Sequence, residues 1–264
     1  MNRQIQTGVS GGDMFNNIKL EKPIFITGCS NSGTSVLFYS LLWNEELGGF
    51  LQEVNAYCKW IPKNVGLPDR LFSLAPAFYE YYFKLNSLKE IEVKSELLNC
   101  LSNPNFVKKG KRLVFKDPRF SLRLKWLKKI FPDSYIIAII RNPYAVIEGI
   151  MRRDKRININ QAILQYIITN KVIEKEGKEI DKFKLIKYED MIKADKFPPS
   201  KFWDSLLDFL ELDKNRFRIP TKTNWSKFDK TRNQTSIKRL SRWEKELITF
   251  ATSDIMEKYG YEKE

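Results

Sequence analysis

The chain has 264 residues, the length of one large domain or two small ones, and it can bury a core without disulfides or metals. It carries 46 Lys and Arg against 32 Asp and Glu, a formal charge of +14, and it contains no histidine. The missing histidine excludes Ser-His-Asp and Cys-His catalysis and every metal site that needs imidazole, while the charge favours anionic partners.

The first segment, residues 1–22, is polar and rich in Gly and Asn, so we expect a flexible leader without the apolar region of a signal peptide. No apolar run is long enough to span a bilayer. Cys29, Cys58 and Cys100 form no CxxC pair, which is typical of a reducing compartment. These features predict a soluble, cytoplasmic protein.

Four short, nearly continuous apolar runs predict buried strands at residues 23–27, 113–116, 135–140 and 183–188. Apolar residues at helical spacing follow the first three runs, Ser200 predicts a helix start, and a last helix is expected at 237–259. Strands that alternate with helices predict an α/β fold with a central parallel β-sheet flanked by helices. We expect residues 23–264 to form one such domain.

Two segments interrupt this pattern. Residues 54–100 hold many aromatic residues punctuated by prolines, which predicts a helical insertion. Residues 214–236 are polar and basic and predict a long loop, of a length that is often functional.

The loop from Gly28 to Ser35 carries the strongest local signal, because it follows a predicted strand and opens a helix with the spacing G-x4-G-T-S. Backbone N–H groups of such a loop and the helix N-terminus bind anions, and Ser32, Thr34 and Ser35 add hydroxyl donors. The fold is therefore P-loop NTPase-like. Thr34 stands where the Walker Lys would be, which favours a 5′-phosphate over a triphosphate with magnesium. The alternative is an ordinary Gly/Ser turn.

Several motifs in the expected order resemble the sulfotransferases that use 3′-phosphoadenosine 5′-phosphosulfate (PAPS) as sulfuryl donor. They are the loop Ser32-Gly33-Thr34-Ser35, Lys116-Asp117-Pro118-Arg119, Arg141-Asn142-Pro143 after a strand, Lys187-Tyr188-Glu189-Asp190 and Gly260-Tyr261. The resemblance covers about residues 22–262. It implies transfer of a sulfuryl group to an acceptor hydroxyl, with PAP as product and no metal.

The resemblance also implies residues that bind PAPS. The phosphosulfate loop corresponds to Asn31, Ser32, Gly33, Thr34 and Ser35. Arg141 would clamp a second phosphate beside a helix that Asn142 caps and Pro143 opens. Arg153 matches a basic position of tyrosylprotein sulfotransferases, and Tyr188 could contact the nucleotide; a solvated basic face and a half-buried core tyrosine are the alternatives.

Two further residues are candidates for catalysis. Cytosolic sulfotransferases use a His base, other branches use a Glu shortly after the phosphate-loop helix, and Glu53 occupies that kind of position. Lys116 ends a predicted strand and could stabilise charge on the sulfuryl group; its alternative role is an ion pair with Asp117 or Glu53.

The sequence departs from the family at Asn31, where a basic residue is usual, at Gly149, where a Ser is usual, and at Ala56, where tyrosylprotein enzymes have an Arg. The acceptor is therefore expected to be a saccharide or another small hydroxylated molecule rather than a protein tyrosine. Three alternatives stay open: a degenerate protein that binds PAP without turnover, a P-loop kinase or NTPase, and a binder of nucleic acid or another polyanion. The last has no RNP, KH or helix-turn-helix pattern to support it.

Overall fold

The computed structural model describes residues 20–50, 53–54, 93–95, 97, 106–108, 110–194, 200–218 and 231–264. Most of the expected leader and nearly all of the expected helical insertion at 54–100 lie outside the described residues. Within the described ranges, no helix combines the length and the hydropathy needed to cross a membrane.

The centre of the molecule is a six-stranded sheet in the order β3-β2-β4-β1-β5-β6. The strands are β1 (Ile24–Gly28), β2 (Leu47–Phe50), β3 (Phe106–Lys108), β4 (Arg112–Lys116), β5 (Tyr135–Ile140) and β6 (Phe183–Lys187). All neighbouring pairs are parallel except β2 with β3, which is antiparallel. The predicted parallel sheet is confirmed, and the four predicted strands correspond to β1, β4, β5 and β6.

The sequence analysis missed β2 and β3. The sequence of β2 is LGGF, and glycine is depleted in strands because it adds no side chain to pack. Gly49 is needed in β2 for space: a Cβ there would lie 2.7 Å from the carbonyl oxygen of Val114 in β4. Close packing between strands, rather than intrinsic preference, accounts for this strand.

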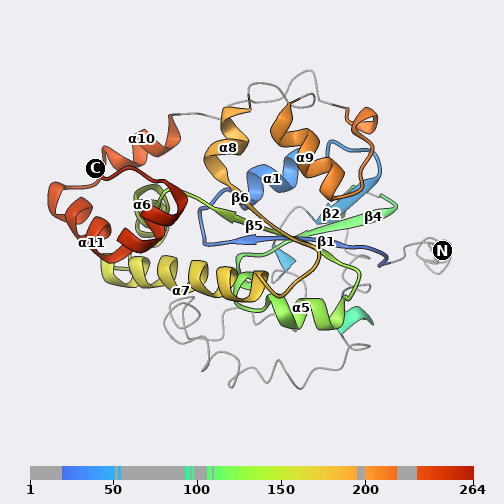
Figure 1. Cartoon of the computed structure of the whole chain (residues 1–264), viewed down its shortest axis with the longest axis horizontal. Helices are drawn as coiled ribbons and strands as arrows, with labels where there is room; N and C mark the ends of the chain where they lie inside the picture. The colour runs from blue at the N-terminus through green and yellow to red at the C-terminus, as the bar shows by residue number, and fades with distance from the viewer. Residues whose placement is uncertain are drawn as a thin grey trace, which may run out of the picture.

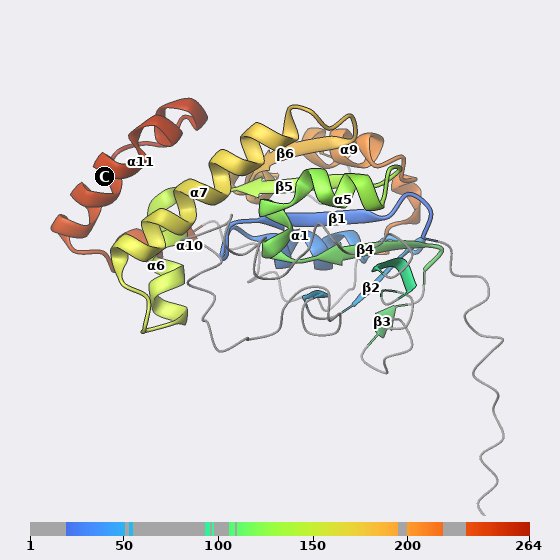
Figure 2. The ribbon, with the colours of Figure 1, turned by 90° about the horizontal axis from the view of Figure 1, so that it is seen from below.

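Helices cover both faces of the sheet (Figures 1 and 2). On one face lie α1 (Thr34–Leu41), α8 (Tyr188–Lys193) and α9 (Lys201–Phe209); on the other lie α5 (Leu124–Ile130) and α7 (Ile159–Gly177). Beyond the carboxyl ends of the strands lie α6 (Pro143–Arg153), α10 (Arg232–Ile237) and α11 (Arg242–Tyr259). Two short 3-10 helices, η3 (Pro118–Leu122) and η4 (Lys214–Arg216), complete the described elements.

Helix caps agree with the sequence at two predicted positions. The Ser200 side chain accepts a hydrogen bond from the Trp203 N–H at the start of α9. The Asn142 side chain accepts one from the Ala145 N–H at the start of α6, and Pro143 is the first helical residue. Both caps satisfy backbone donors that have no partner inside the helix.

The C-terminal part of the chain differs from the prediction. The last helix expected near 237–259 is confirmed and ends at Tyr259, but its predicted start is wrong, because α11 begins at Arg242 and Leu240 lies before it. Ser241 and Glu244 form a reciprocal capping box, which starts a new helix at this point. Residues 232–236, expected to belong to a loop, form most of α10.

Tyr188 also differs from its prediction as the last residue of a strand. The strand β6 ends at Lys187, and Tyr188 is the first residue of α8. Glu189 and Asp190 lie in the first turn of α8, where negative charge stabilises a helix.

Candidate active site

A cavity of about 500 Å³ lies at the carboxyl ends of the strands. The neighbouring strands β1 and β4 lead to helices on opposite faces of the sheet, α1 and α5, and such a divergence opens a crevice at the strand ends. One side of the cavity, here called the sheet wall, comprises the segments that follow β1, β2, β4, β5 and β6. The opposite side, here called the helix wall, comprises α6, α10 and the turn after α10.

The phosphate loop of the sheet wall connects β1 to α1 and is closed by a hydrogen bond from the Ser32 N–H to the Cys29 carbonyl, 3.0 Å. The Ser32 hydroxyl and the Asn31 side-chain amide nitrogen are buried, and neither has a hydrogen-bond partner among the described residues. Buried polar groups in folded proteins normally have partners. These two groups therefore suit a loop that binds an anion.

Gly33 fixes the conformation of this loop. Its φ of 103° lies in the left-handed region, and a Cβ there would lie 2.4 Å from the ring of Tyr188. The ring of Tyr188 is buried, so the loop passes directly over an aromatic face. Only glycine allows this approach of backbone to ring.

Lys116, the last residue of β4, joins two candidate residues. Its ammonium donates to the Ser35 hydroxyl at 3.1 Å and to Glu53 Oε1 at 3.4 Å. Lys116 is 7% exposed, and a buried charge of this kind needs such partners. The structure therefore brings together the phosphate-loop helix, the strand-end lysine and the carboxylate that the sequence analysis singled out.

The other oxygen of Glu53 faces Arg119. Arg119 Nη1 lies 3.5 Å from Glu53 Oε2 and 3.4 Å from Asp117 Oδ1. Asp117 is fully buried, and its side chain also caps η3 by accepting from the Arg119 N–H. Glu53 thus lies between two cations, one of which, Arg119, is also held by a buried carboxylate.

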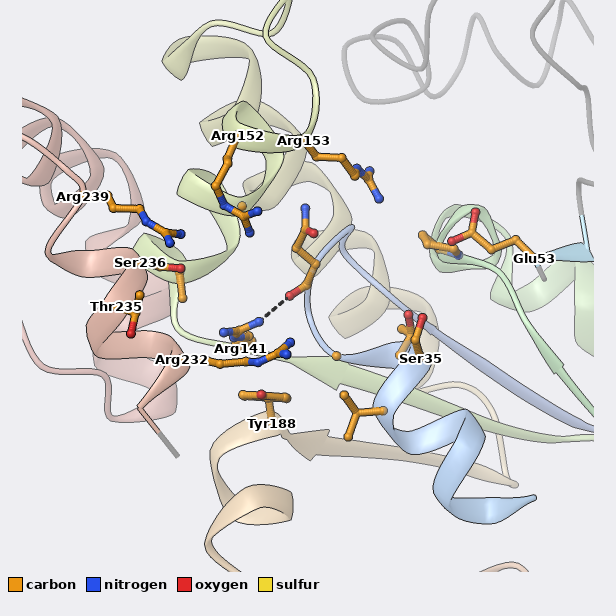
Figure 3. A pocket seen from close by; sticks show the side chains of 17 residues that line it. Ser35, Glu53, Arg141, Arg152, Arg153, Tyr188, Arg232, Thr235, Ser236 and Arg239 are labelled. Carbon is orange, nitrogen blue, oxygen red and sulfur yellow. Dashed lines mark hydrogen bonds between the residues drawn. The ribbon is translucent and has the colours of Figure 1, made fainter. Parts of the chain in front are cut away.

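Arg141 follows β5 and is 8% exposed. It donates to the Asn31 carbonyl at 2.9 Å and to Asn233 Oδ1 at 2.8 Å, and its guanidinium lies 4.2 Å from the ring centroid of Tyr188 (Figure 3). Burial lowers the pKa of Arg141 from its ordinary value of 12.5, which leaves it charged at neutral pH. Arg141 therefore presents a fixed charge between the phosphate loop and α10.

Glu189 in α8 links the sheet to the C-terminal helices. Its Oε1 accepts from the Asn142 N–H at 3.0 Å and from Asn233 Nδ2 at 2.7 Å, and its Oε2 accepts from the Tyr261 hydroxyl at 3.2 Å. One carboxylate thus holds α6, α10 and the end of the chain together.

Arginines dominate the helix wall (Figure 3). Arg152 and Arg239 both pair with Glu148, a buried carboxylate of α6, at 3.1 Å and 3.4 Å. Arg153 and Arg232 have no ion-pair partner in the described part of the chain. This wall carries more positive charge than its carboxylates neutralise, so it favours anionic ligands.

Two of the three departures from the family pattern, Asn31 and Gly149, lie against one another, and the third, Ala56, lies outside the described residues. A Cβ at Gly149 in α6 would lie 3.1 Å from Cβ and Cγ of Asn31. The side chain of Asn31 therefore occupies space that a larger residue at 149 would need, and the two positions are coupled by packing.

The structure gathers the candidate residues at one place. The lining of the cavity includes Asn31, Gly33, Thr34, Ser35, Glu53, Arg141, Arg153 and Tyr188. Lys116 contacts two of these residues, and Ser32 lies buried in the same loop. Their roles in binding and catalysis remain predictions.

Sequence reasoning did not assign the supporting residues. Arg119 and Glu189 lie inside motifs that were quoted, and their membership of those motifs was the signal that could have identified them. Glu148 of α6 was missed, whereas Arg232, Asn233 and Arg239 belong to a basic segment for which the sequence predicted a role but no individual contacts. A basic segment before the last helix was the signal for α10, but contacts between distant helices are not encoded in local spacing.

Comparisons with known proteins agree with one another. The model of the Sulfotransferase family matches residues 23–216. The omega-hydroxy-beta-dihydromenaquinone-9 sulfotransferase Stf3 of Mycobacterium bovis is 26% identical over 148 residues, which cover 48% of this chain and 38% of that protein. The chain thus matches well under half the length of this curated relative.

Solved structures share the fold. The sulfotransferase domain from the curacin biosynthetic pathway has a TM-score of 0.59 at 18% identity and covers 93% of this chain and 100% of that one. The sulfotransferase domain of the Synechococcus PCC 7002 olefin synthase has a TM-score of 0.56 at 19% identity, with coverage of 92% and 96%.

Proposed function

Because this chain belongs to the sulfotransferase family, we propose that it transfers a sulfuryl group from PAPS to an acceptor hydroxyl and releases PAP. One observation carries the proposal: a single cavity joins a loop with buried, unsatisfied donors to a wall of arginines. PAPS carries a phosphosulfate at one end and a 3′-phosphate at the other, so its two anionic ends suit the two sides of this cavity.

The sheet wall would hold the phosphosulfate. The loop N–H groups, the Ser32 hydroxyl and the side chains of Thr34 and Ser35 can donate to its oxygens, and the α1 N-terminus adds positive potential. Arg141, which lies between the phosphate loop and α10 where the two walls meet, would bind the 3′-phosphate, and its guanidinium is already oriented by Asn233 and by the Asn31 carbonyl. The nucleotide-binding roles of Tyr188 and Arg153 are part of the same proposal.

Glu53 would act as the general base. It would accept the proton of the acceptor hydroxyl while the acceptor oxygen forms a bond to sulfur and the bond from sulfur to the phosphate oxygen of PAP breaks. Lys116, 3.4 Å from Glu53 and 3.1 Å from Ser35, would neutralise charge on the departing oxygen. Arg119 would act as a positioning residue, because its contact at 3.5 Å orients the Glu53 carboxylate.

We propose a small hydroxylated acceptor, such as a saccharide, and a cytoplasmic location. The named relative acts on a hydroxylated menaquinone, so a hydroxyl is the shared feature of the acceptors considered. Transfer needs no metal in this scheme, since Lys and Arg side chains and loop N–H groups provide the positive charge.

The direct experiment is transfer of labelled sulfate from PAPS to a panel of hydroxylated acceptors, together with the dissociation constants of PAP and of ATP with magnesium. We expect transfer without added metal and PAP binding at least tenfold tighter than ATP binding. PAP binding without transfer to any acceptor would support the degenerate nucleotide binder. Magnesium-dependent ATP turnover would support a kinase or NTPase, and nucleic-acid binding without PAP binding would support a polyanion binder.

A further inference from the structure

A second cavity, of about 340 Å³, adjoins the one assigned to the nucleotide. The two cavities share Glu53, Pro118 and Arg153 in their linings. Because Glu53 belongs to both, a ligand in either cavity can contact this carboxylate. A hydroxyl in the second cavity would therefore lie between the base and a nucleotide in the first.

Polar side chains predominate among the described residues that line the second cavity. Besides the shared residues, its lining includes Arg119, Asp154, Arg156 and Gln165, with Ile157 as an aliphatic member. Sites for apolar ligands are lined predominantly by hydrophobic and aromatic side chains. The described lining therefore suits a polar ligand rather than a hydrocarbon chain.

Three arginines and two carboxylates stand among the described residues that line this cavity. Arg156 pairs with Asp154 through two bonds, of 2.8 Å and 2.9 Å. Arg119 faces Asp117 and Glu53. Arg153 has no carboxylate within ion-pair distance in the parts of the chain that the structure describes. Its guanidinium points toward the side of the cavity that carries Glu53 (Figure 3).

We propose that the second cavity holds the acceptor, and that Arg153 binds an oxyanion group, a carboxylate or a phosphate, that the acceptor carries near its reacting hydroxyl. This inference rests on the proposed function and narrows its acceptor class. A guanidinium binds either oxyanion through paired, charge-assisted hydrogen bonds. The volume is at the lower end of the ~300–1,000 Å³ typical of ligand sites, which suits a unit as small as one sugar ring.

Matched pairs of acceptors test whether the protein prefers an acceptor that carries a negative charge. Methyl glucoside is compared with its uronate and with glucose 6-phosphate, and benzyl alcohol is compared with 4-(hydroxymethyl)benzoate. For the wild type we expect kcat/KM to be about 10- to 100-fold higher for the anionic member of at least one pair, the range expected for a hydrogen bond to a charged group. The uronate and phosphate arms distinguish the two oxyanions, and a preference for either supports the proposal.

Two neighbouring variants locate the effect. Arg153→Gln should abolish the preference for the anionic acceptor, and because Arg153 lines both cavities, any loss of PAP affinity should be smaller than the loss caused by Arg152→Gln. Arg152→Gln is the matched control, because Arg152 lines the first cavity but is absent from the described lining of the second. It should weaken PAP binding and keep the acceptor preference. Thermal unfolding of both variants checks that each is folded.

Other results would overturn the inference. If kcat/KM is the same for the neutral and the anionic member of every pair, the proposed function stands and the inference of an anionic acceptor is wrong. If Arg153→Gln weakens PAP binding and leaves acceptor preference unchanged, Arg153 belongs to the nucleotide site. If PAP binds but no acceptor is sulfated, the proposed function fails. The acceptor pairs are then titrated into the PAP-loaded protein to test whether the second cavity binds anionic molecules. Tighter binding of the anionic member that is lost in Arg153→Gln supports the inference, and equal binding of both members overturns it.

Discussion

The sheet wall and the helix wall present their charges in different ways. Lys116 and Arg141 of the sheet wall are 7% and 8% exposed and are held by several contacts each. On the helix wall, the side chains of Arg152 and Arg239 are 54% and 51% exposed and share one carboxylate. A buried, fixed group acts without further ordering, whereas an exposed side chain loses conformational entropy when it binds. We therefore expect large losses from changes on the sheet wall and graded losses on the helix wall.

The largest effect is expected for Glu53→Gln, which keeps the size of the side chain but removes the proton acceptor. The kcat of sulfuryl transfer should fall by about 10²- to 10⁴-fold, the usual contribution of a general base, while the Kd of PAP stays nearly constant. Glu46→Gln is the control, since Glu46 pairs with Arg216 away from the cavity. An undiminished rate for Glu53→Gln would reject the assignment of the base and weaken the contrast between the walls.

A second change on the sheet wall, Gly33→Ala, tests the loop itself. The new Cβ would lie 2.4 Å from the Tyr188 ring at a residue with φ of 103°, so loop or ring must move. We expect a Kd for PAP raised at least tenfold and a free energy of unfolding lowered by about 1–3 kcal/mol, measured by urea denaturation.

Gly260→Ala provides the matched control for this strain. Gly260 also has a positive φ, 64°, but a Cβ there meets no atom within 4 Å. This variant should lose about 1 kcal/mol of stability, because a residue with a Cβ is disfavoured in the left-handed region, and it should bind PAP normally. Equal PAP affinities for both variants would show that the approach of Gly33 to Tyr188 is unimportant for binding.

On the helix wall, Arg232→Ala should raise the Kd of PAP by about three- to tenfold, since an exposed charge is screened by solvent and salt. The loss should shrink as ionic strength rises from 0.05 to about 0.5 M, because screening then weakens the wild type as well. Isothermal titration at several salt concentrations measures both effects, with Arg216→Ala as a control outside the cavity lining. A loss that is large and independent of salt would place Arg232 with the fixed charges of the sheet wall.

The effect that is smallest at neutral pH concerns a buried group of the phosphate loop. Burial raises the pKa of the Cys29 thiol from 9.0 to about 12. The unfolded chain releases this proton at lower pH than the folded one. The contribution of Cys29 to the free energy of unfolding is therefore fully present below pH 9 and is lost as pH rises from about 9 toward about 12. Above pH 9 the free energy of unfolding of Cys29→Ala should fall less steeply with pH than that of the wild type, by up to ~1.4 kcal/mol per pH unit. Identical slopes in urea denaturation between pH 8 and 11 would contradict a thiol kept protonated by burial.

The difference between the walls also explains what the sequence could predict. The sheet wall follows apolar strands, and its motif residues stand directly at or after their ends, so the predicted strands and the family resemblance together pointed to Ser35, Lys116 and Arg141. The phosphate loop was predicted because Gly28, Gly33 and the hydroxyl residues follow one another within a few positions.

The helix wall depends on contacts between distant segments. Glu148 pairs with Arg239, and Arg141 with Asn233, across about ninety residues, and no local period reports such contacts. The short helix α10 was missed for a related reason. Its sequence RNQTSI has little intrinsic helix preference and few apolar residues, and tertiary contacts to α6 place it.

Glu189 has a consequence for the order in which the site is assembled. Its contacts reach Asn142, Asn233 and Tyr261, so one carboxylate of α8 fastens segments that lie both before and after it in the chain. During synthesis the parallel strands can pair as soon as β6 has emerged, whereas Glu189 can contact α10 only after Asn233 has emerged. A ribosome-bound chain stopped before α10 would thus contain the phosphate loop without a completed binding cavity.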